Sequence, residues 1–487
     1  MTERDGVPSG LTPRADAWTR AILGPFHPVA RSSSASRVPV PRDTALRASG
    51  GGTHDGTTPG ARWTRDGAPS NGPDRSTRDA TLDELRHVIR RIESRHVPRA
   101  APEPIERVLG GALLDTGAGT LLVTRREYPL AHRHGAVALA DAFAASEPVL
   151  RVVARAGEEP GEPRGLLFID TETTGLAGGT GTYAFLVGVG AIEDDRFVVT
   201  QYFMRDLDEE PALLEALGPR LDAASGLVTF NGSGFDLPLL ETRFILGRRR
   251  WPAMIPHVDL LRPARRVWLG HLADCRLATV EREALGLARE DDVPGAMIPA
   301  LYFQFLRTRQ ARPLTRVFAH NRDDVLSLVA LLGWFARALE RDGATLSAAE
   351  LAGLGRLLEP VDVERGLACY RAALERGLDG GAGLWTCLRL AAWEKRRERW
   401  DAACALWETA VRHATFDPRP WEELAKFHEH RTRNFATARE LVVTALHRAR
   451  TADAVPRVID DFAYRLARLE RRLAVSPAPL AGRGNGM

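Results

Sequence analysis

Residues 166–176 read LLFIDTETTGL, and this stretch decides the fold class of the chain. Residues 166–169 form a continuous apolar run, typical of a central strand that is covered on both faces. We predict that the strand ends at Asp170 and that a tight loop follows. Side chains two positions apart on a strand point to the same face, so Asp170 and Glu172 should lie side by side. Two neighbouring carboxylates beside an apolar strand are costly to bury, so the stretch predicts a cation between them.

The segments that follow alternate between strand and helix patterns. Two apolar runs, 182–192 and 197–204, read as strands joined by the turn residues Glu193, Asp194 and Asp195. The later predicted elements are a helix over 209–224, a strand over 226–230, a helix over about 234–246 and a long helix over about 314–340. This order predicts an α/β domain over 151–345, with a mixed sheet flanked by helices.

The N-terminal part differs from this domain in composition and periodicity. Residues 1–78 are rich in Gly, Ser, Pro, Thr and Arg and have no helical or strand period, so we predict that they are disordered. For residues 79–150 we expect a helix, which begins with a capping box at Thr81. Two short strands, around 113–114 and 120–124, should follow it. These residues would form a small extension to the main domain.

Residues 346–475 have a helical pattern with a repeat of 35 residues. Ala368, Ala403 and Ala438 recur at this interval. The period suits stacked helix pairs of the tetratricopeptide kind, and an irregular helical domain is the alternative. The fold class is therefore α/β, followed by an all-α, repeat-like domain that we expect to bind a protein partner. Residues 476–487 should form a disordered tail.

The composition excludes several classes of protein. The chain has 44% hydrophobic and 26% charged residues, as ordinary globular proteins do. No apolar run approaches the roughly 20 residues that cross a bilayer, and four scattered cysteines favour reduced thiols, so we expect a cytoplasmic protein without a membrane partner. All but two of the 66 basic residues are Arg, the exceptions being Lys395 and Lys426, which leaves no P-loop. The net charge of +3 requires any nucleic-acid attraction to come from a local patch.

Two further motifs place acidic residues near the first. The run NGSGFD (231–236) puts Asp236 at the start of a helix, where its carboxylate would favour the helix dipole even without another role. In AHNRDD (319–324), His320 and Asp324 lie one helical turn apart on the same face. Such a pair is often only a surface ion pair. These residues gain weight from their combination, because strand ends and helix starts on one edge of an α/β sheet converge.

The combined order is Asp-x-Glu, then Asp, then His-x-x-x-Asp. Four carboxylates, Asp170, Glu172, Asp236 and Asp324, can neutralise two Mg²⁺ or Mn²⁺ ions, which prefer oxygen ligands. Two such ions stabilise the attacking and the leaving oxygens of a displacement at phosphorus. His320 suits the removal of a proton from the attacking water near neutral pH.

These residues resemble the DEDD exonuclease superfamily, which has a ribonuclease H-like fold. The run FIDTETTGLAGGTGTYAFLVGVG (168–190) is similar in particular to a bacterial YprB-type ribonuclease H-like family. The stretches HVDLLRPARRVW, CRLATVEREALGL and REDDVPGAMIPALYFQF also resemble that family, so the resemblance covers roughly 105–345. A helical C-terminus also accompanies such domains.

The resemblance implies a role for each motif residue. The four carboxylates would be the metal ligands, and His320 would stand in the general-base position. Thr173, Thr174 and Leu176 would line the terminal nucleotide, while Asn231 would donate to a phosphate or sugar oxygen. One feature departs from the family pattern: the histidine branch of the superfamily usually places His five residues before its Asp, and four is the spacing of the tyrosine branch.

We therefore expect a metal-dependent 3′-to-5′ exonuclease that hydrolyses single-stranded DNA or RNA. The alternatives are a non-catalytic docking module for nucleic acid or protein on a nuclease fold, and a structure-specific endonuclease. DNA and RNA remain open as substrates, because contacts to the 2′-hydroxyl depend on details of the pocket.

Overall fold

The computed structural model describes residues 103–155, 157–175, 181–252, 255–341, 343 and 345–475. Within them, seven strands form one mixed sheet in the order β1-β2-β7-β6-β5-β8-β9. The strands are β1 (Gly111–Thr116), β2 (Gly119–Pro129), β5 (Leu166–Thr173), β6 (Ala184–Glu193), β7 (Arg196–Phe203), β8 (Gly226–Thr229) and β9 (His257–Asp259). A separate pair joins β3 (Arg133–His134) to β4 (Val137–Ala138). Because β5 pairs antiparallel with β6 and parallel with β8, the antiparallel part of the sheet meets its parallel part at β5.

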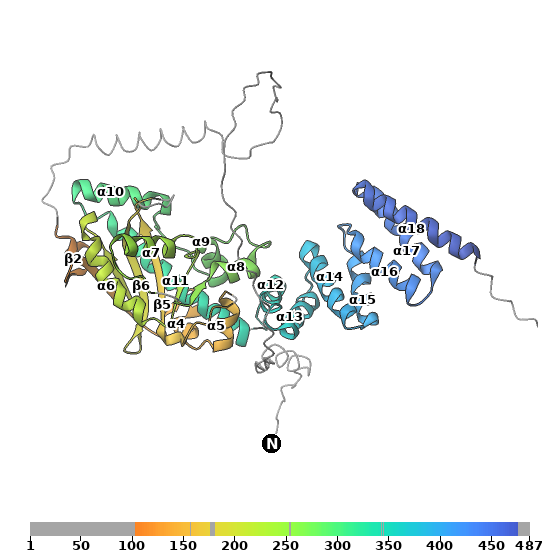
Figure 1. Ribbon diagram of the computed structural model, residues 1–487, viewed down its shortest axis with the longest axis horizontal. Helices are drawn as coiled ribbons and strands as arrows, with labels where there is room; N and C mark the ends of the chain where they lie inside the picture. The colour runs from red at the N-terminus through yellow and green to blue at the C-terminus, as the bar shows by residue number, and fades with distance from the viewer. Residues whose placement is uncertain are drawn as a thin grey trace, which may run out of the picture. The chain divides into compact units, whose positions relative to one another are not determined.

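Helices cover both faces of the sheet (Figure 1). They are α3 (Ile105–Leu109), α4 (Leu139–Phe143), α5 (Glu147–Val153), α6 (Glu210–Ala223), α7 (Asp236–Leu246), α8 (Leu261–Trp268), α9 (Leu277–Val280), α10 (Ile298–Thr308) and α11 (Leu314–Glu340). Short helical turns are η1 (Pro163–Gly165), η2 (Leu207–Glu209), η3 (Glu281–Leu285) and η4 (Gly295–Met297). The predicted α/β class with a mixed sheet and flanking helices is confirmed.

The side chains of β5 alternate between the two layers of helices. Leu166 and Phe168 belong to the hydrophobic cluster that includes α4, α5 and α11. Leu167 and Ile169 belong to the cluster that includes α6 and α7. Since alternate residues of a strand share a face, this pattern places the side chain of Asp170 toward α11.

One predicted boundary was wrong, because β5 runs through Asp170 and ends at Thr173. Its pairing with β6 continues to Thr173 opposite Ala184, with an irregularity in register between Glu172 and Thr173. This pairing with β6 satisfies the backbone hydrogen-bonding groups of residues that we expected to form a loop. The predicted long helix matches α11, and the two strands expected near 113 and 122 belong to the main sheet as β1 and β2.

The region after α11 is all helical, as predicted. Its helices are α12 (Ala348–Leu358), α13 (Val363–Glu375), α14 (Gly380–Arg396), α15 (Trp400–Val411), α16 (Pro418–His430), α17 (Phe435–Thr451) and α18 (Pro456–Val475). The first two continue the core of the sheet region, since Leu351 and Cys369 join the cluster that contains α11. Helix α12 also packs closely on α8, where a Cβ at Gly353 would lie 2.3 Å from the carbonyl oxygen of Val267.

The 35-residue interval corresponds to equivalent buried positions in alternate helices. Ala403 of α15 and Ala438 of α17 are both fully buried. The same interval separates Glu359, Glu394 and Glu429, all of them buried. A recurring buried acid is a repeat signal that the sequence analysis missed. The assignment to tetratricopeptide units stays a prediction.

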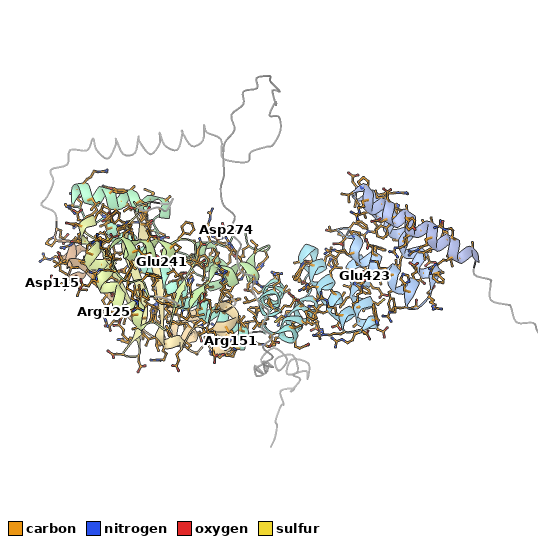
Figure 2. All side chains as sticks on the ribbon, in the orientation of Figure 1. Asp115, Arg125, Arg151, Glu241, Asp274 and Glu423 are labelled. Atoms are coloured by element: carbon orange, nitrogen blue, oxygen red, sulfur yellow. The ribbon has the colours of Figure 1, made fainter. Side chains whose placement is uncertain are left out.

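Some charged side chains of the sheet domain form ordinary surface pairs. Arg125 on β2 binds Glu193, and Arg151 on α5 binds Glu147, with both arginines about half exposed (Figure 2). Such exposed pairs contribute about 1 kcal/mol or less to stability. The predicted disorder of 1–78, the helix after Thr81 and the tail 476–487 lie outside the described residues.

Candidate active site

Strand β5 carries the first two predicted site residues. Asp170 and Glu172 both lie within the strand, two positions apart, and therefore share the face that is directed at α11. Each is partly buried, and the side chain of Glu172 is only 12% exposed. The carboxylates thus stand at the end of a buried apolar strand, as the sequence predicted.

Helix α11 brings three polar side chains to this face. His320 and Asp324 lie one turn apart, and Asn321 is fully buried between them. The amide of Asn321 donates to the carbonyl oxygen of Asp170 (3.1 Å) and to its Oδ2 (2.8 Å). Gln201 donates in turn to Asn321 Oδ1 at 2.8 Å, which fixes the orientation of the amide.

Asn321 is a site residue that sequence reasoning missed. The signal was present, because an uncharged amide inside the buried stripe of a long helix must find hydrogen-bond partners. The neighbouring strand is shaped for it: a Cβ at Gly188 on β6 would lie 2.3 Å from Asn321 Oδ1. We conclude that Asn321 positions the carboxylate of Asp170.

The third acidic residue comes from α7, the helix that follows the loop after β8. Asp236 is the first residue of this helix, and its Oδ1 accepts a hydrogen bond from the hydroxyl of Thr171 at 2.5 Å. The preceding loop turns at Asn231, which has a φ of 67°. Its backbone amide donates to the carboxylate of Asp259 (2.7 Å), a buried residue that the sequence analysis did not single out.

Burial and mutual repulsion raise the pKa values of the acidic residues at the end of β5. Burial raises the pKa of Asp170 well above its usual value, and repulsion from Asp324, Glu172 and Asp236 adds to the effect. Burial, followed by Asp324 and Asp236, likewise raises the pKa of Glu172. For Asp236, burial outweighs its hydrogen bonds and raises the pKa to about 6. Without a cation the site therefore resists full ionisation.

His320 is held by an acid from another segment. Its Nδ1 lies 2.7 Å from Oδ1 of Asp292. A carboxylate can only accept, so Nδ1 carries a hydrogen, and in the neutral ring Nε2 is then the basic nitrogen. Nε2 lies 3.6 Å from Oδ2 of Asp324 and 4.0 Å from Oε1 of Glu172. The basic nitrogen of His320 thus faces the acidic cluster. Sequence reasoning missed Asp292.

A guanidinium also contacts the cluster. Arg289 donates to Oδ1 of Asp324 and to Oε1 of Glu281, and its side chain is 11% exposed. Burial lowers the pKa of Arg289, but the attraction of Asp324 and Glu281 outweighs it and raises the pKa, so this residue stays charged.

As these side chains stand, no three His, Cys, Asp or Glu residues of the described chain enclose a point where a metal ion would fit. The hydrogen bonds account for this. Asp170 is turned to Asn321, Asp236 to Thr171 and Asp324 to Arg289. The chemistry of the donor set nevertheless fits hard divalent cations, because it consists of carboxylate oxygens whose mutual repulsion a cation would relieve.

Of the predicted nucleotide-lining residues, Thr173 is the last residue of β5 and Thr174 follows it directly. The hydroxyl of Thr173 donates to the carbonyl oxygen of Gly175 (2.8 Å), and that of Thr174 accepts from the backbone of Tyr183 (3.0 Å). Both hydroxyls are thus used within the loop itself. Leu176 lies outside the described residues.

Two comparisons with known proteins identify the family of the chain. Residues 167–336 match the family model of the RNase_H superfamily. A protein of Bacillus subtilis (strain 168), described as uncharacterized protein YprB, is 32% identical over 363 residues, which cover 72% of this chain and 86% of that protein. The chain belongs to the YprB-type ribonuclease H-like family.

Membership of the YprB-type family gives the chain a nuclease-type fold. Folds of this superfamily generally work with divalent metal ions, and the fold suggests binding and hydrolysis of nucleic acid. In the described part of the chain, no helix combines the length and the apolar character needed to cross a bilayer.

Proposed function

We propose that this YprB-type protein is a metal-dependent 3′-to-5′ exonuclease of the DEDD type, acting on single-stranded DNA or RNA. One observation carries the proposal: the buried acids Asp170, Glu172 and Asp236 have raised pKa values, and Nε2 of His320 lies 3.6 Å from Oδ2 of Asp324. A cluster of this kind is unfavourable for a structural site and suits the binding of cations.

Each residue of the candidate site has a distinct role in this proposal. Asp170, Glu172, Asp236 and Asp324 would hold two divalent cations, Mg²⁺ or Mn²⁺. When bound, the two ions supply the stabilisation of the attacking and leaving oxygens at phosphorus. His320 Nε2 accepts the proton of the attacking water, and Asp292 keeps its ring in the required tautomer.

The 3′ end of the nucleic-acid substrate would lie beside the loops that follow β5 and β8. Thr173, Thr174 and Leu176 would line the terminal nucleotide, and Asn231 would donate to a phosphate or sugar oxygen. Phe235 supports this placement, because its ring is 60% exposed directly before Asp236. An exposed aromatic ring offers a face on which a base of a single strand can stack.

The deciding experiment is degradation of oligonucleotides labelled at the 5′ or the 3′ end. Single-stranded DNA and RNA are incubated with Mg²⁺, Mn²⁺ or a chelator. We expect stepwise loss from the 3′ end in metal and none in chelator or with Asp170→Asn. Internal cuts would favour the structure-specific endonuclease, and absence of cleavage under every condition would favour the non-catalytic docking module. Cleavage that persists in chelator would contradict the proposed metal dependence.

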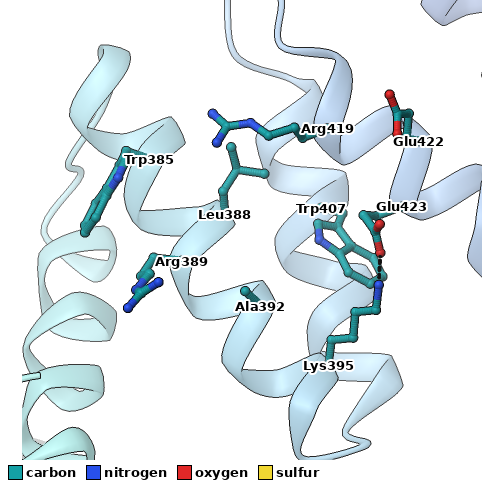
Figure 3. Close-up of a pocket in the computed structure, with 9 residues that line it drawn as sticks. All are labelled: Trp385, Leu388, Arg389, Ala392, Lys395, Trp407, Arg419, Glu422 and Glu423. Atoms are coloured by element: carbon teal, nitrogen blue, oxygen red, sulfur yellow. Dashed lines mark hydrogen bonds and ion pairs between the residues drawn. The ribbon is translucent and has the colours of Figure 1, made fainter. Parts of the chain in front are cut away.

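For the helical region we propose the binding of a protein partner without a catalytic contribution. A cavity of about 400 Å³ lies between α14 and α16, with Trp385, Leu388 and Arg389 on one side and Arg419 on the other (Figure 3). Trp385 is 37% exposed, and Lys395 pairs with Glu423 at the far end. The lining combines two tryptophans with three cationic and two acidic side chains, which suits a peptide segment with both apolar and charged residues.

Variants of residues that line the cavity between α14 and α16 test this second proposal. Trp385→Ala combined with Arg389→Gln should leave the cleavage of short oligonucleotides unchanged, because no residue that lines this cavity contacts the acidic cluster. Full loss of cleavage by the folded double variant would contradict it. Point variants serve better than removal of residues from 346 onward, since α12 and α13 belong to the core of the sheet region.

A further inference from the structure

Arg289 places a permanent positive charge against one acidic residue of the candidate site. It follows η3 in a loop that passes alongside α11, and its guanidinium is shared among three carboxylates. Nη2 donates to both Asp324 and Glu281, and Nη1 lies 3.6 Å from Oδ2 of Asp292. Among the contacts described for the four proposed metal ligands, this is the one made by a guanidinium.

The contact affects the oxygen atoms that a metal ion would need. Oδ1 of Asp324 accepts from Arg289, while Oδ2 is directed at His320. A divalent ion bound through Asp324 would therefore meet a guanidinium of the same sign of charge at the same carboxylate. Arg289 and the ion are competitors for Asp324.

If Arg289 moves away from Asp324, the other two of its carboxylate partners stay within reach. Glu281 is 1% exposed and already accepts from Nη2, and Asp292 lies within reach of Nη1. The Nε of Arg289 is buried and has no hydrogen-bond partner, so the present position does not satisfy the whole guanidinium. A small withdrawal from Asp324 toward Glu281 and Asp292 would keep Arg289 paired.

The loop that carries Arg289 also carries Asp292, which orients His320. Arg316 of α11 donates to the carbonyl oxygens of Asp291 and Asp292 and so fastens the end of the loop. The position of Arg289 and the orientation of the proposed base are therefore set by one short segment.

We propose that Arg289 is an internal cation that neutralises Asp324 in the metal-free protein and weakens the binding of one divalent ion, which displaces it toward Glu281 and Asp292. This inference rests on the proposed function, since it concerns the same four carboxylates. It makes Arg289 a positioning residue, with a measurable effect on metal affinity that does not depend on turnover.

The test is a calorimetric titration of the full chain with Mn²⁺ in the absence of nucleic acid. Arg289→Gln removes the competitor, so the weaker Mn²⁺ site should bind at least about tenfold more tightly. Glu281→Gln removes the alternative partner and presses Arg289 onto Asp324, so the same site should bind several-fold more weakly. Arg282→Gln is the matched control, because Arg282 is exposed and pairs only with Glu283 in the same segment. It should leave the Mn²⁺ affinity unchanged.

The two substitutions have opposite predicted signs, and circular dichroism establishes that each variant is folded. Equal Mn²⁺ affinity in the wild type, Arg289→Gln and Glu281→Gln would overturn the inference and leave the proposed function standing. If Arg289→Gln does not fold, an unchanged or higher affinity in Glu281→Gln overturns it alone. Failure of every form to bind Mn²⁺, including the wild type, would instead remove the metal-dependent function on which the inference rests.

Discussion

Buried carboxylates occur both in the sheet region and in the helical region, but their surroundings are opposite. At the end of β5, burial and mutual repulsion raise the pKa values of Asp170 and Glu172. In the helical region, burial alone would raise the pKa of Glu359, yet hydrogen bonds from Arg389, Trp393 and Tyr370 outweigh it and lower the pKa.

The helical pattern is general within its repeat. Glu394 is also buried, and hydrogen bonds from Arg371 and Arg399 lower its pKa despite burial. Glu429, one interval further on, accepts from Arg465 and Arg468. These acids join neighbouring helices and need no further cation. In the described contacts, Asp170 and Asp236 accept from Asn321 and Thr171 and from no Arg or Lys, and of the four acids at the candidate site Arg289 contacts Asp324. Buried acids without cationic partners are candidates for cation binding.

The largest expected effect is that of Asp170→Asn on cleavage. Loss of one proposed ligand should lower kcat by about 10³-fold or more, because the charge that holds the cations is removed. The metal-free protein should become more stable, since each unit by which the pKa is raised costs about 1.4 kcal/mol when the group ionises. Thermal melting in chelator and in Mn²⁺ measures this, and Asn321 can still donate to the new amide oxygen. A lower melting temperature in chelator would break the comparison.

Removal of the proposed base comes next in size. His320→Ala should lower kcat by roughly 10²–10⁴-fold and abolish the fall of activity on the acid side, because protonated His320 cannot accept a proton from water. Asp292→Ala should cost about tenfold by freeing the ring, and His320→Tyr should recover part of the activity. The measurement is a pH–rate profile at saturating Mn²⁺. An Ala variant with under tenfold loss and an unchanged acid side would exclude His320 from the reaction.

Glu359→Gln sharpens the comparison from the other region. This change should lower the free energy of unfolding by about 2–3 kcal/mol, because a charged acceptor of three donors is lost from a buried position. Chemical denaturation measures it, and cleavage of short oligonucleotides should stay normal in the folded variant. The sign is thus opposite to that of Asp170→Asn in chelator. A stabilising effect would mean that this acid, too, is strained.

The smallest effect concerns His134 of β3, which contacts the buried side of α11. His134 is buried with Nε2 2.8 Å from Oγ of Ser327, and burial lowers its pKa to about 4. The folded state therefore binds fewer protons than the unfolded state below pH 6.5, so stability is present above that pH and is lost as pH falls toward 4. The loss between pH 7.5 and 5 should be about 2 kcal/mol. His134→Gln should flatten this part of the pH–stability curve, whereas an equal slope in the variant would assign the loss to other groups.

Much of the fold followed from periodicity. The apolar run before Asp170 and the long stripe of α11 gave the central strand and the helix that covers it. The extension of β5 to Thr173 did not follow, because the pairing of its last residues depends on β6, a partner that local sequence does not specify. The buried Glu of each helical repeat escaped notice because an exposed Glu is the usual expectation on a helix.

The amino-acid sequence alone determined which residues of the candidate site share a face of one strand or helix. Period two on β5 joined Asp170 to Glu172, and one helical turn on α11 joined His320 to Asp324. Only the tertiary structure decided that Asp292 orients the histidine and that Arg289, one of many arginines, meets Asp324. These contacts join residues 28 and 35 positions apart through an irregular loop, and a loop has no period from which a contact can be read.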